Sequence, residues 1–298
     1  MSCDSKTQKQ TAVYILYRFF LIWLLPFVLN IRAENKIHII DDEDFRKVLV
    51  QNIEKLEHEQ KFTDINLLYN HLERKSFELK LKPVPSKKVK KAKDIYNLAV
   101  KSTLIIARGY KSPVTKMWQT SMAGGVVIDK SGIVVTNYHV MQPSRGNVMA
   151  AMTSDKQVYP VVEVLAADQA MDIAIIKVDA KELTPLALST GNDVGTKVFT
   201  VSHPDGRLYS LSQGIITRHF YDYDRNMKAH RFAISADFAK GSSGAPILDD
   251  KGNVIGLVSS TRSIYYNKEN GVDQNLQMVV KNCVPVQSIL KLLKSPTK

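Results

Sequence analysis

Cysteine, tryptophan and long apolar runs are scarce in this chain of 298 residues. Its two cysteines are Cys3 and Cys283, and Cys3 lies in a segment that we expect to be removed, so the core has to be stable without a disulfide. The main apolar run, Phe19 to Leu29, is shorter than the roughly 20 residues of a membrane-spanning helix. Internal repeats, a His-Glu-x-x-His metal motif and a phosphate-binding loop are also absent, which argues against repeat proteins, zinc peptidases of that class and P-loop enzymes.

Residues 1–33 have the pattern of a secretory signal peptide. A basic stretch with Lys6 and Lys9 precedes the apolar run, and small Ala33 follows it. Extending the apolar run backwards takes in Arg18, so an uncleaved membrane anchor is the alternative. Both readings predict that the rest of the chain is exported, either secreted or periplasmic, with membrane contact only through an uncleaved anchor.

The formal net charge is +12, and the densest basic segment is the lysine run between residues 87 and 93. This run follows Pro83 and Pro85, so residues 79–94 are interpreted as a solvated Lys/Pro-rich linker, with attraction to an anionic surface as the alternative. No aromatic residues interleave the lysines, and nucleic-acid binding is therefore not expected.

Residues 34–78 are predicted to be a helical N-terminal region. Apolar residues recur at three- and four-residue steps from Phe45 to Leu56, behind an acidic start at residues 41–44. A second helix is predicted over residues 65–72, with Thr63 as its N-cap. Packing on the main domain is the expected role of these helices; homo-oligomer formation and regulation of the site are the alternatives.

From about residue 102 the pattern changes to short apolar runs separated by turn residues. Residues 129–132 and 249–252 are predicted hairpin loops between such runs. Because no long helices alternate with the runs, the sequence predicts a mostly β barrel or sandwich. An amphipathic helix is expected over residues 284–293, at the end of a main domain that covers residues 95–298.

Three short segments contain the candidate catalytic residues. His139 follows an apolar run, Asp172 precedes another, and Ser243 lies in a turn bracketed by glycines. A serine hydroxyl becomes a nucleophile when a neutral imidazole takes its proton and a carboxylate orients that imidazole. Asp168 is the rival for the acid, and Asp172 is favoured because a run of apolar residues follows it directly. The glycines allow a sharp turn, so the amides of Gly241 and Ser243 are the candidate oxyanion hole. Such chemistry needs no cofactor or metal.

These segments resemble the trypsin-like serine proteases of the HtrA/Deg branch. The resemblance covers roughly residues 95–292 and implies a chymotrypsin-like fold of two six-stranded antiparallel β-barrels with the triad between them. It also implies that the strand at Val258, Ser259 and Ser260 pairs with an extended peptide substrate. The chain is too short for the PDZ domain that many members carry after the protease. The matching stretches are residues 124–140, 172–177, 203–206, 212–216, 241–247 and 256–259.

The expected activity is that of a serine endopeptidase acting on proteins or peptides. A protease-fold binding or chaperone-like module with a closed site is the alternative. Asp237 lies six residues before Ser243, the spacing at which trypsins place the acid that binds an Arg or Lys side chain. It is therefore a candidate substrate-binding residue, and bracing of its loop is the other interpretation.

Overall fold

The computed structural model describes residues 39–224 and 227–294. The chain divides into two units, residues 1–40 and 41–298, and the fold below is that of the second unit. The predicted signal peptide or anchor, residues 1–33, lies outside the described residues. Within the described ranges, no helix is both long and apolar enough to cross a membrane.

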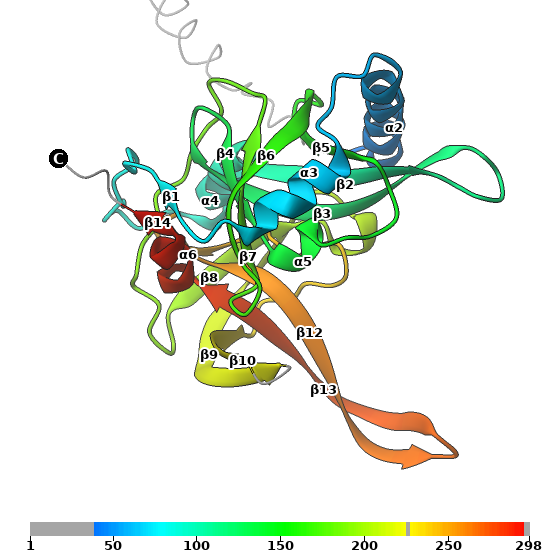
Figure 1. Ribbon diagram of the computed structural model, residues 1–298. Helices are drawn as coiled ribbons and strands as arrows, with labels where there is room; N and C mark the ends of the chain where they lie inside the picture. Colours follow the sequence, from blue (N-terminus) through cyan, green and yellow to red (C-terminus); the bar gives the residue numbers. More distant parts are fainter. Residues whose placement is uncertain (1–38, 225–226, 295–298) are drawn as a thin grey trace, which may run out of the picture. The chain divides into compact units, whose positions relative to one another are not determined.

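The main part of this unit is two closed antiparallel barrels of six strands each (Figure 1). The order in the first barrel is β2-β3-β4-β7-β6-β5. Its strands are β2 (Thr103–Lys111), β3 (Trp118–Asp129), β4 (Ile133–Thr136), β5 (Val148–Met152), β6 (Val158–Asp168) and β7 (Ile173–Val178). Branched and small side chains such as Val127, Val134 and Ile176 fill its interior, as a narrow barrel requires.

The second barrel has the strand order β10-β13-β12-β11-β8-β9. Its strands are β8 (Lys197–Ser202), β9 (Ser210–Asp224), β10 (Met227–Ile234), β11 (Pro246–Asp249), β12 (Val254–Glu269) and β13 (Val272–Pro285). The core contains Phe232, Ile247 and Cys283, all fully buried. Beyond the barrel, β12 and β13 continue together as a long two-stranded ribbon (Figure 1). The predicted double-barrel, mostly β fold is confirmed.

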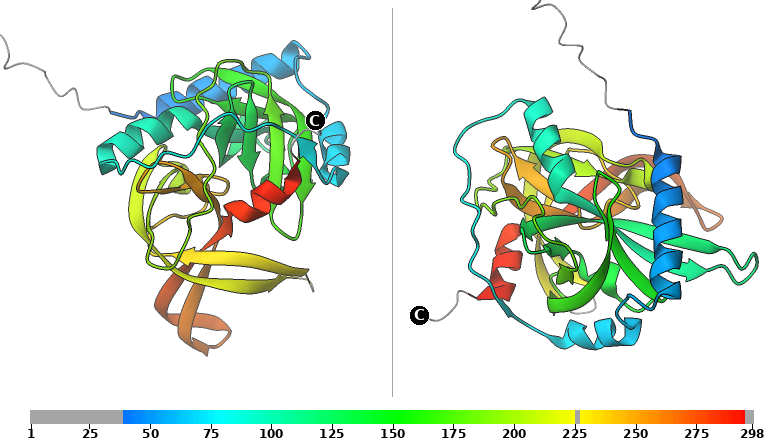
Figure 2. Two further views of the ribbon diagram at one scale, coloured as in Figure 1. Left: turned by 90° about the vertical axis from the view of Figure 1, so that its left-hand side faces the viewer. Right: turned by 90° about the horizontal axis from the view of Figure 1, so that it is seen from above.

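Helices α2 (Asp42–His58) and α3 (Ile65–Asn70) pack on the first barrel (Figure 2). Apolar residues on one face of α2 are buried, as the sequence periodicity predicted. The prediction of Thr63 as N-cap of α3 is wrong: Asp64 caps it, accepting a hydrogen bond from the Asn66 amide at 2.7 Å. The Thr63 hydroxyl instead donates to the Val162 carbonyl at 3.0 Å, because it faces β6.

The remaining elements join the helical region to the barrels and end the chain. The Lys/Pro-rich linker is bonded to the β11–β12 turn. The Ser86 amide donates to Asn253 Oδ1 at 2.7 Å, and Asn253 Nδ2 donates to the Ser86 carbonyl at 2.9 Å. Helix α4, which the sequence did not predict, buries Ile95 and Ala99. These elements are the 3₁₀ turns η1 (His71–Glu73) and η2 (Pro204–Gly206), strands β1 (Phe77–Glu78) and β14 (Leu293–Lys294), and helices α4 (Ala92–Ser102), α5 (Tyr138–Met141) and α6 (Val286–Leu292).

Candidate active site

Two neighbouring strands of the first barrel bring His139 and Asp172 together. Thr136, at the end of β4, lies opposite Ala174 at the start of β7. His139 follows β4 on the short helix α5, and Asp172 immediately precedes β7. Antiparallel pairing therefore places two residues that are 33 positions apart in the chain at one end of the barrel.

The His139 imidazole is bonded to the Asp172 carboxylate through Nδ1. The distances from Nδ1 to Oδ1 and Oδ2 are 2.9 and 3.1 Å, and the His139 amide also donates to Oδ1, at 3.1 Å. An ionised carboxylate only accepts hydrogen bonds, so Nδ1 carries the hydrogen and Nε2 keeps its lone pair. This tautomer can take a proton from a hydroxyl. The rival acid, Asp168, instead accepts a hydrogen bond from the Met171 amide at 2.9 Å.

Asp172 lies in a site that favours its charged form. Burial by itself would raise the pKa of this carboxyl, but the hydrogen bond and charge of His139 and the hydroxyl of Ser259 together lower the pKa below its ordinary value. The Ser259 hydroxyl donates to Asp172 Oδ2 at 2.7 Å. Asn137 adds a further support, since its side-chain amide donates to the Asp172 carbonyl at 3.0 Å.

Ser243 lies in a tight turn of the second barrel. Gly241 and Gly244 have φ angles of +94° and +80°, in the left-handed region that favours glycine. A Cβ on Gly244 would lie 2.3 Å from the Gly124 carbonyl oxygen, so only glycine lets the turn approach β3 this closely. The Gly124 amide donates to the Ser243 carbonyl at 2.7 Å, which fixes the turn against the first barrel.

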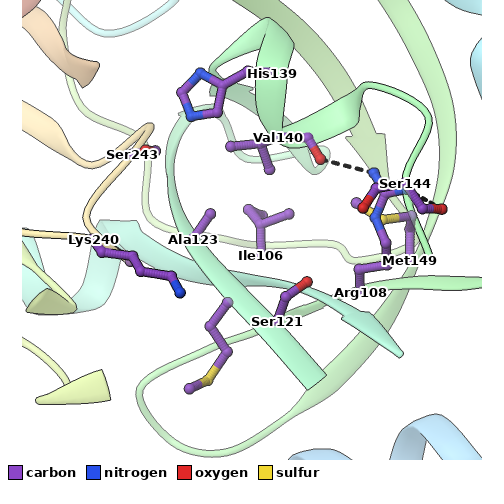
Figure 3. A pocket seen from close by; sticks show the side chains of 12 residues that line it. Ile106, Arg108, Ser121, Ala123, His139, Val140, Ser144, Met149, Lys240 and Ser243 are labelled. Atoms are coloured by element: carbon purple, nitrogen blue, oxygen red, sulfur yellow. Dashed lines mark hydrogen bonds between the residues drawn. The ribbon is translucent and has the colours of Figure 1, made fainter. Parts of the chain in front are cut away.

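Ser243 and His139 border one cavity of about 220 Å³ together with Gly241 (Figure 3). The Ser243 hydroxyl donates to the Ser259 carbonyl at 3.3 Å, and among the described residues it has no hydrogen bond to His139. The amides of Gly241 and Ser243 donate to no acceptor in the described part of the chain. Two N–H groups without partners on the same turn as a serine hydroxyl can receive an oxyanion.

The predicted substrate-binding residues are distributed between different places. Ser259 and Ser260 border a second cavity, of about 410 Å³, which His139 also borders. Val258 does not reach it: its side chain is buried, and its N–H and C=O are bonded to Ala245 and Gly244. Its place in the barrel core explains this difference from the prediction.

Asp237 is not at the bottom of the cavity that Ser243 and His139 border. Its side chain is 85% exposed and forms an ion pair with Lys281 at 2.6 Å, while its amide is bonded to Ser212. These contacts match the loop-bracing interpretation, and a role in specificity stays a prediction. Within the described ranges, no group of three or more His, Cys, Asp or Glu side chains could hold a metal ion.

The supporting roles of Ser259 and Arg231, like that of Asn137, escaped the sequence analysis. The hydroxyl of Ser259 supports Asp172, whereas the sequence suggested only a backbone role for that strand. Arg231, on β10, donates to the carbonyls of Ala170 and Met171, at 3.1 and 3.2 Å, and so holds the loop before Asp172. An arginine in the middle of a strand, directly before the apolar residues 232–234, was the signal for it, but its partners lie about 60 residues away.

Comparison with known proteins gives one consistent result. Residues 123–257 match the family model of the trypsin-like peptidase domain. The chain is 34% identical to Protease Do-like 1, chloroplastic, of Arabidopsis thaliana over 45% of this chain and 31% of the relative. It is 29% identical to a probable periplasmic serine endoprotease, DegP-like, of Halomonas elongata over 48% of this chain and 30% of the relative.

A solved structure of an HtrA-type protease with a decapeptide has the same fold. It superimposes with a TM-score of 0.53 at 16% identity, over 67% of this chain and 65% of the other. The chain spans about a third of the length of the two curated relatives named above. On these matches, the chain carries a trypsin-like peptidase domain related to the Deg and HtrA proteases.

Proposed function

We propose that the protein is a serine endopeptidase that hydrolyses peptide bonds through an acyl-enzyme intermediate. The observation that carries the proposal is the cavity that Ser243, Gly241 and His139 border, with Asp172 bonded to His139 and with the Gly241 and Ser243 amides unbonded among the described residues. Each group has the chemical property that acyl transfer needs: a hydroxyl, an oriented base, an ionised carboxylate and an oxyanion site.

In the proposed reaction, Ser243 Oγ attacks the carbonyl carbon of the scissile bond while its proton passes to His139 Nε2. The oxygen of the tetrahedral intermediate accepts hydrogen bonds from the Gly241 and Ser243 amides. When the C–N bond breaks, the proton moves from His139 to the leaving amine, and an ester remains on Ser243. Water then attacks this ester while His139 takes the water's proton. The C–O bond to Ser243 breaks, His139 returns the proton to Ser243 Oγ, and the acid product leaves.

The proposed substrates are protein or peptide segments in extended conformation. Ser259 and Ser260 border the second cavity beside His139, and the related HtrA-type structure was solved with a decapeptide. We further propose export of the chain, on the basis of residues 1–33 and of the probable periplasmic relative. Assembly into a homo-oligomer belongs to the same proposal.

A fluorophosphonate probe tests the chemistry directly, because it labels only a serine whose hydroxyl is activated. We expect labelling of the wild-type chain and hydrolysis of unfolded casein, and loss of both in Ser243→Ala and His139→Ala. Ser242→Ala is the matched control. Ser242 is buried and adjacent to Ser243 in the chain, so removing its hydroxyl should leave labelling in place. A wild-type chain that neither labels nor hydrolyses casein would favour the closed binding module instead.

A further inference from the structure

The turn with the candidate oxyanion hole, residues 240–244, is hydrogen-bonded to the segment 203–209. The Asp205 amide donates to the Lys240 carbonyl at 2.6 Å. In a trans peptide unit the C=O and N–H groups point in opposite directions, so this bond also directs the Gly241 amide away from residues 203–209. The His203 carbonyl of the same segment also lies close to the turn, because a Cβ on Gly241 would lie 2.6 Å from its oxygen.

This supporting segment has an unusual backbone. Asp205 and Tyr209 have φ angles of +52° and +53°, in the left-handed region of backbone conformation that residues other than glycine rarely adopt. Such a conformation persists only where surrounding contacts hold it. The contacts that hold residues 206 and 208 come from helix α2.

Helix α2 reaches the segment with three residues of its first turns. The Asp42 carboxylate accepts a hydrogen bond from the Leu208 amide at 2.9 Å, and the Arg46 guanidinium donates to the Gly206 carbonyl at 3.0 Å. Between them, the Phe45 ring packs against Tyr209 with 5.8 Å between ring centroids. Positions 42, 45 and 46 lie on one face of a helix, so a single face of α2 contacts residues 206, 208 and 209 of the segment.

The fit between helix and segment is close. Gly206 has a φ angle of +75°, and Arg46 Nη2 lies 2.5 Å from where its Cβ would be. A larger residue at position 206 would displace the guanidinium. Arg46 is only partly buried and also pairs with Glu43 at 2.9 Å, so its bond to residue 206 can be broken without opening the core.

We propose that α2 is a brace for the oxyanion hole, in which Asp42 and Arg46 are positioning residues that act through residues 205–208 on the Lys240–Gly241 peptide. The inference rests on the proposed function for its effect on catalysis, but the contacts themselves do not depend on it. Loss of the brace lets the Lys240–Gly241 peptide rotate, which removes the Gly241 amide from the developing oxyanion while His139, Asp172 and Ser243 stay in place.

The test compares three variants of the full chain. Arg46→Ala removes the bond to Gly206, and Arg46→Lys keeps a donor at that position. Glu57→Gln is the control: it removes the ion pair between Glu57 and Lys111, 3.7 Å apart, at the C-terminal end of α2. An oxyanion bond is made in the transition state, so we expect Arg46→Ala to lower kcat by about tenfold with KM within about twofold of wild type. Arg46→Lys should recover part of this loss, and Glu57→Gln should change neither constant.

Hydrogen–deuterium exchange supplies a readout that does not need activity. Peptides covering residues 203–209 should exchange at least about threefold faster in Arg46→Ala, and at the wild-type rate in Glu57→Gln. An equal response in both variants, or no response in Arg46→Ala, overturns the brace. If wild type shows no turnover, the proposed function fails while the exchange result still decides the brace. If Arg46→Ala does not fold, Asp42→Ala, which removes the acceptor for Leu208, takes its place under the same criteria.

Discussion

At the scale of single residues, hydrogen-bond donors keep the buried Asp172 carboxyl ionised. Its side chain is only 14% exposed, and a buried carboxylate is costly unless it is hydrogen-bonded. His139 and Ser259 supply these bonds and lower its pKa against the effect of burial. The hydroxyl of Ser259 therefore helps to keep Asp172 ionised, as the proposed reaction requires.

Ser259→Ala should slow the reaction without weakening substrate binding. A hydrogen bond to a charged group contributes about 1.5–3 kcal/mol, so a loss of about one to two units in log kcat is expected, with KM little changed. Steady-state kinetics on a peptide substrate measures both constants. Ser260→Ala is the control, because Ser260 is exposed and borders the same cavity; an equal loss of kcat there would assign the effect to the cavity wall.

His203 makes stability depend on pH. Full burial lowers the pKa of this imidazole to about 4, below its ordinary value of about 6.5. The unfolded chain therefore binds more protons than the folded chain between these values, and stability is lost as pH falls through this window. The shift corresponds to about 3 kcal/mol when complete.

Urea unfolding at pH 7.5 and pH 4.5 measures this loss. In His203→Asn the side-chain oxygen can still accept the Tyr209 amide, which now donates to His203 Nδ1 at 3.1 Å, but the titrating group is gone. The difference in the free energy of unfolding between the two pH values should therefore shrink in this variant. An unchanged difference would place the acid sensitivity in other groups.

At the scale of elements, α3 illustrates how packing stabilises a short helix. Six residues are too few for a helix to be stable in water by itself. Leu68 of this helix and Leu72 just after it pack in the core of the first barrel, where their exposed fractions are 1% and 3%. The adjacent Leu67 is 48% exposed. Substituting Leu67 and Leu68 one at a time therefore distinguishes the contribution of core packing from that of helix propensity.

Leu68→Ala should lower the free energy of unfolding by about 2–5 kcal/mol through the lost contacts and the cavity left behind. Leu67→Ala should change it by no more than about 0.5 kcal/mol, since the same atoms are removed from the surface. Chemical denaturation of both variants makes the comparison. Similar values would mean that α3 contributes little to the barrel core.

At the scale of the whole unit, the candidate site is shared between the barrels. His139 and Asp172 belong to the first barrel and Ser243 to the second, and the contacts of Arg231 with residues 170 and 171 help fix their separation. Arg231 is 7% exposed, and its removal would take a charged donor from the half-buried carbonyls of residues 170 and 171.

Arg231→Ala should therefore lower both stability and turnover. We expect about 3 kcal/mol less free energy of unfolding, from two hydrogen bonds of a charged donor, together with a fall in kcat as the loop before Asp172 loosens. Arg218→Ala on neighbouring β9 is the control, because Arg218 is exposed. A variant of Arg231 with normal stability and normal kcat would show that the loop is held by its other contacts.

Much of this organisation could be predicted from the sequence, because the chemistry leaves local marks. The glycines around Ser243, the apolar runs beside His139 and Asp172, and the hairpin turns each occupy a few consecutive positions. They predicted a mostly β barrel or sandwich, which the resemblance narrowed to a double barrel. They also predicted Ser243 and His139, which border one cavity, and Asp172, which is bonded to His139. The spacing of apolar residues also predicted helix α2, since periodicity reports the buried face.

Other features were decided by tertiary structure, because they join positions far apart in the chain. The choice of Asp64 over Thr63 as a cap depends on β6, and the exposed position of Asp237 depends on Lys281. The bond from Ser259 to Asp172 spans 87 positions, and the bond from Arg46 to Gly206 spans 160. Sequence by itself determined which residues can carry out the chemistry; only the packing of two barrels and α2 decided which groups orient them, because a hydrogen bond depends on distance in space and not on distance along the chain.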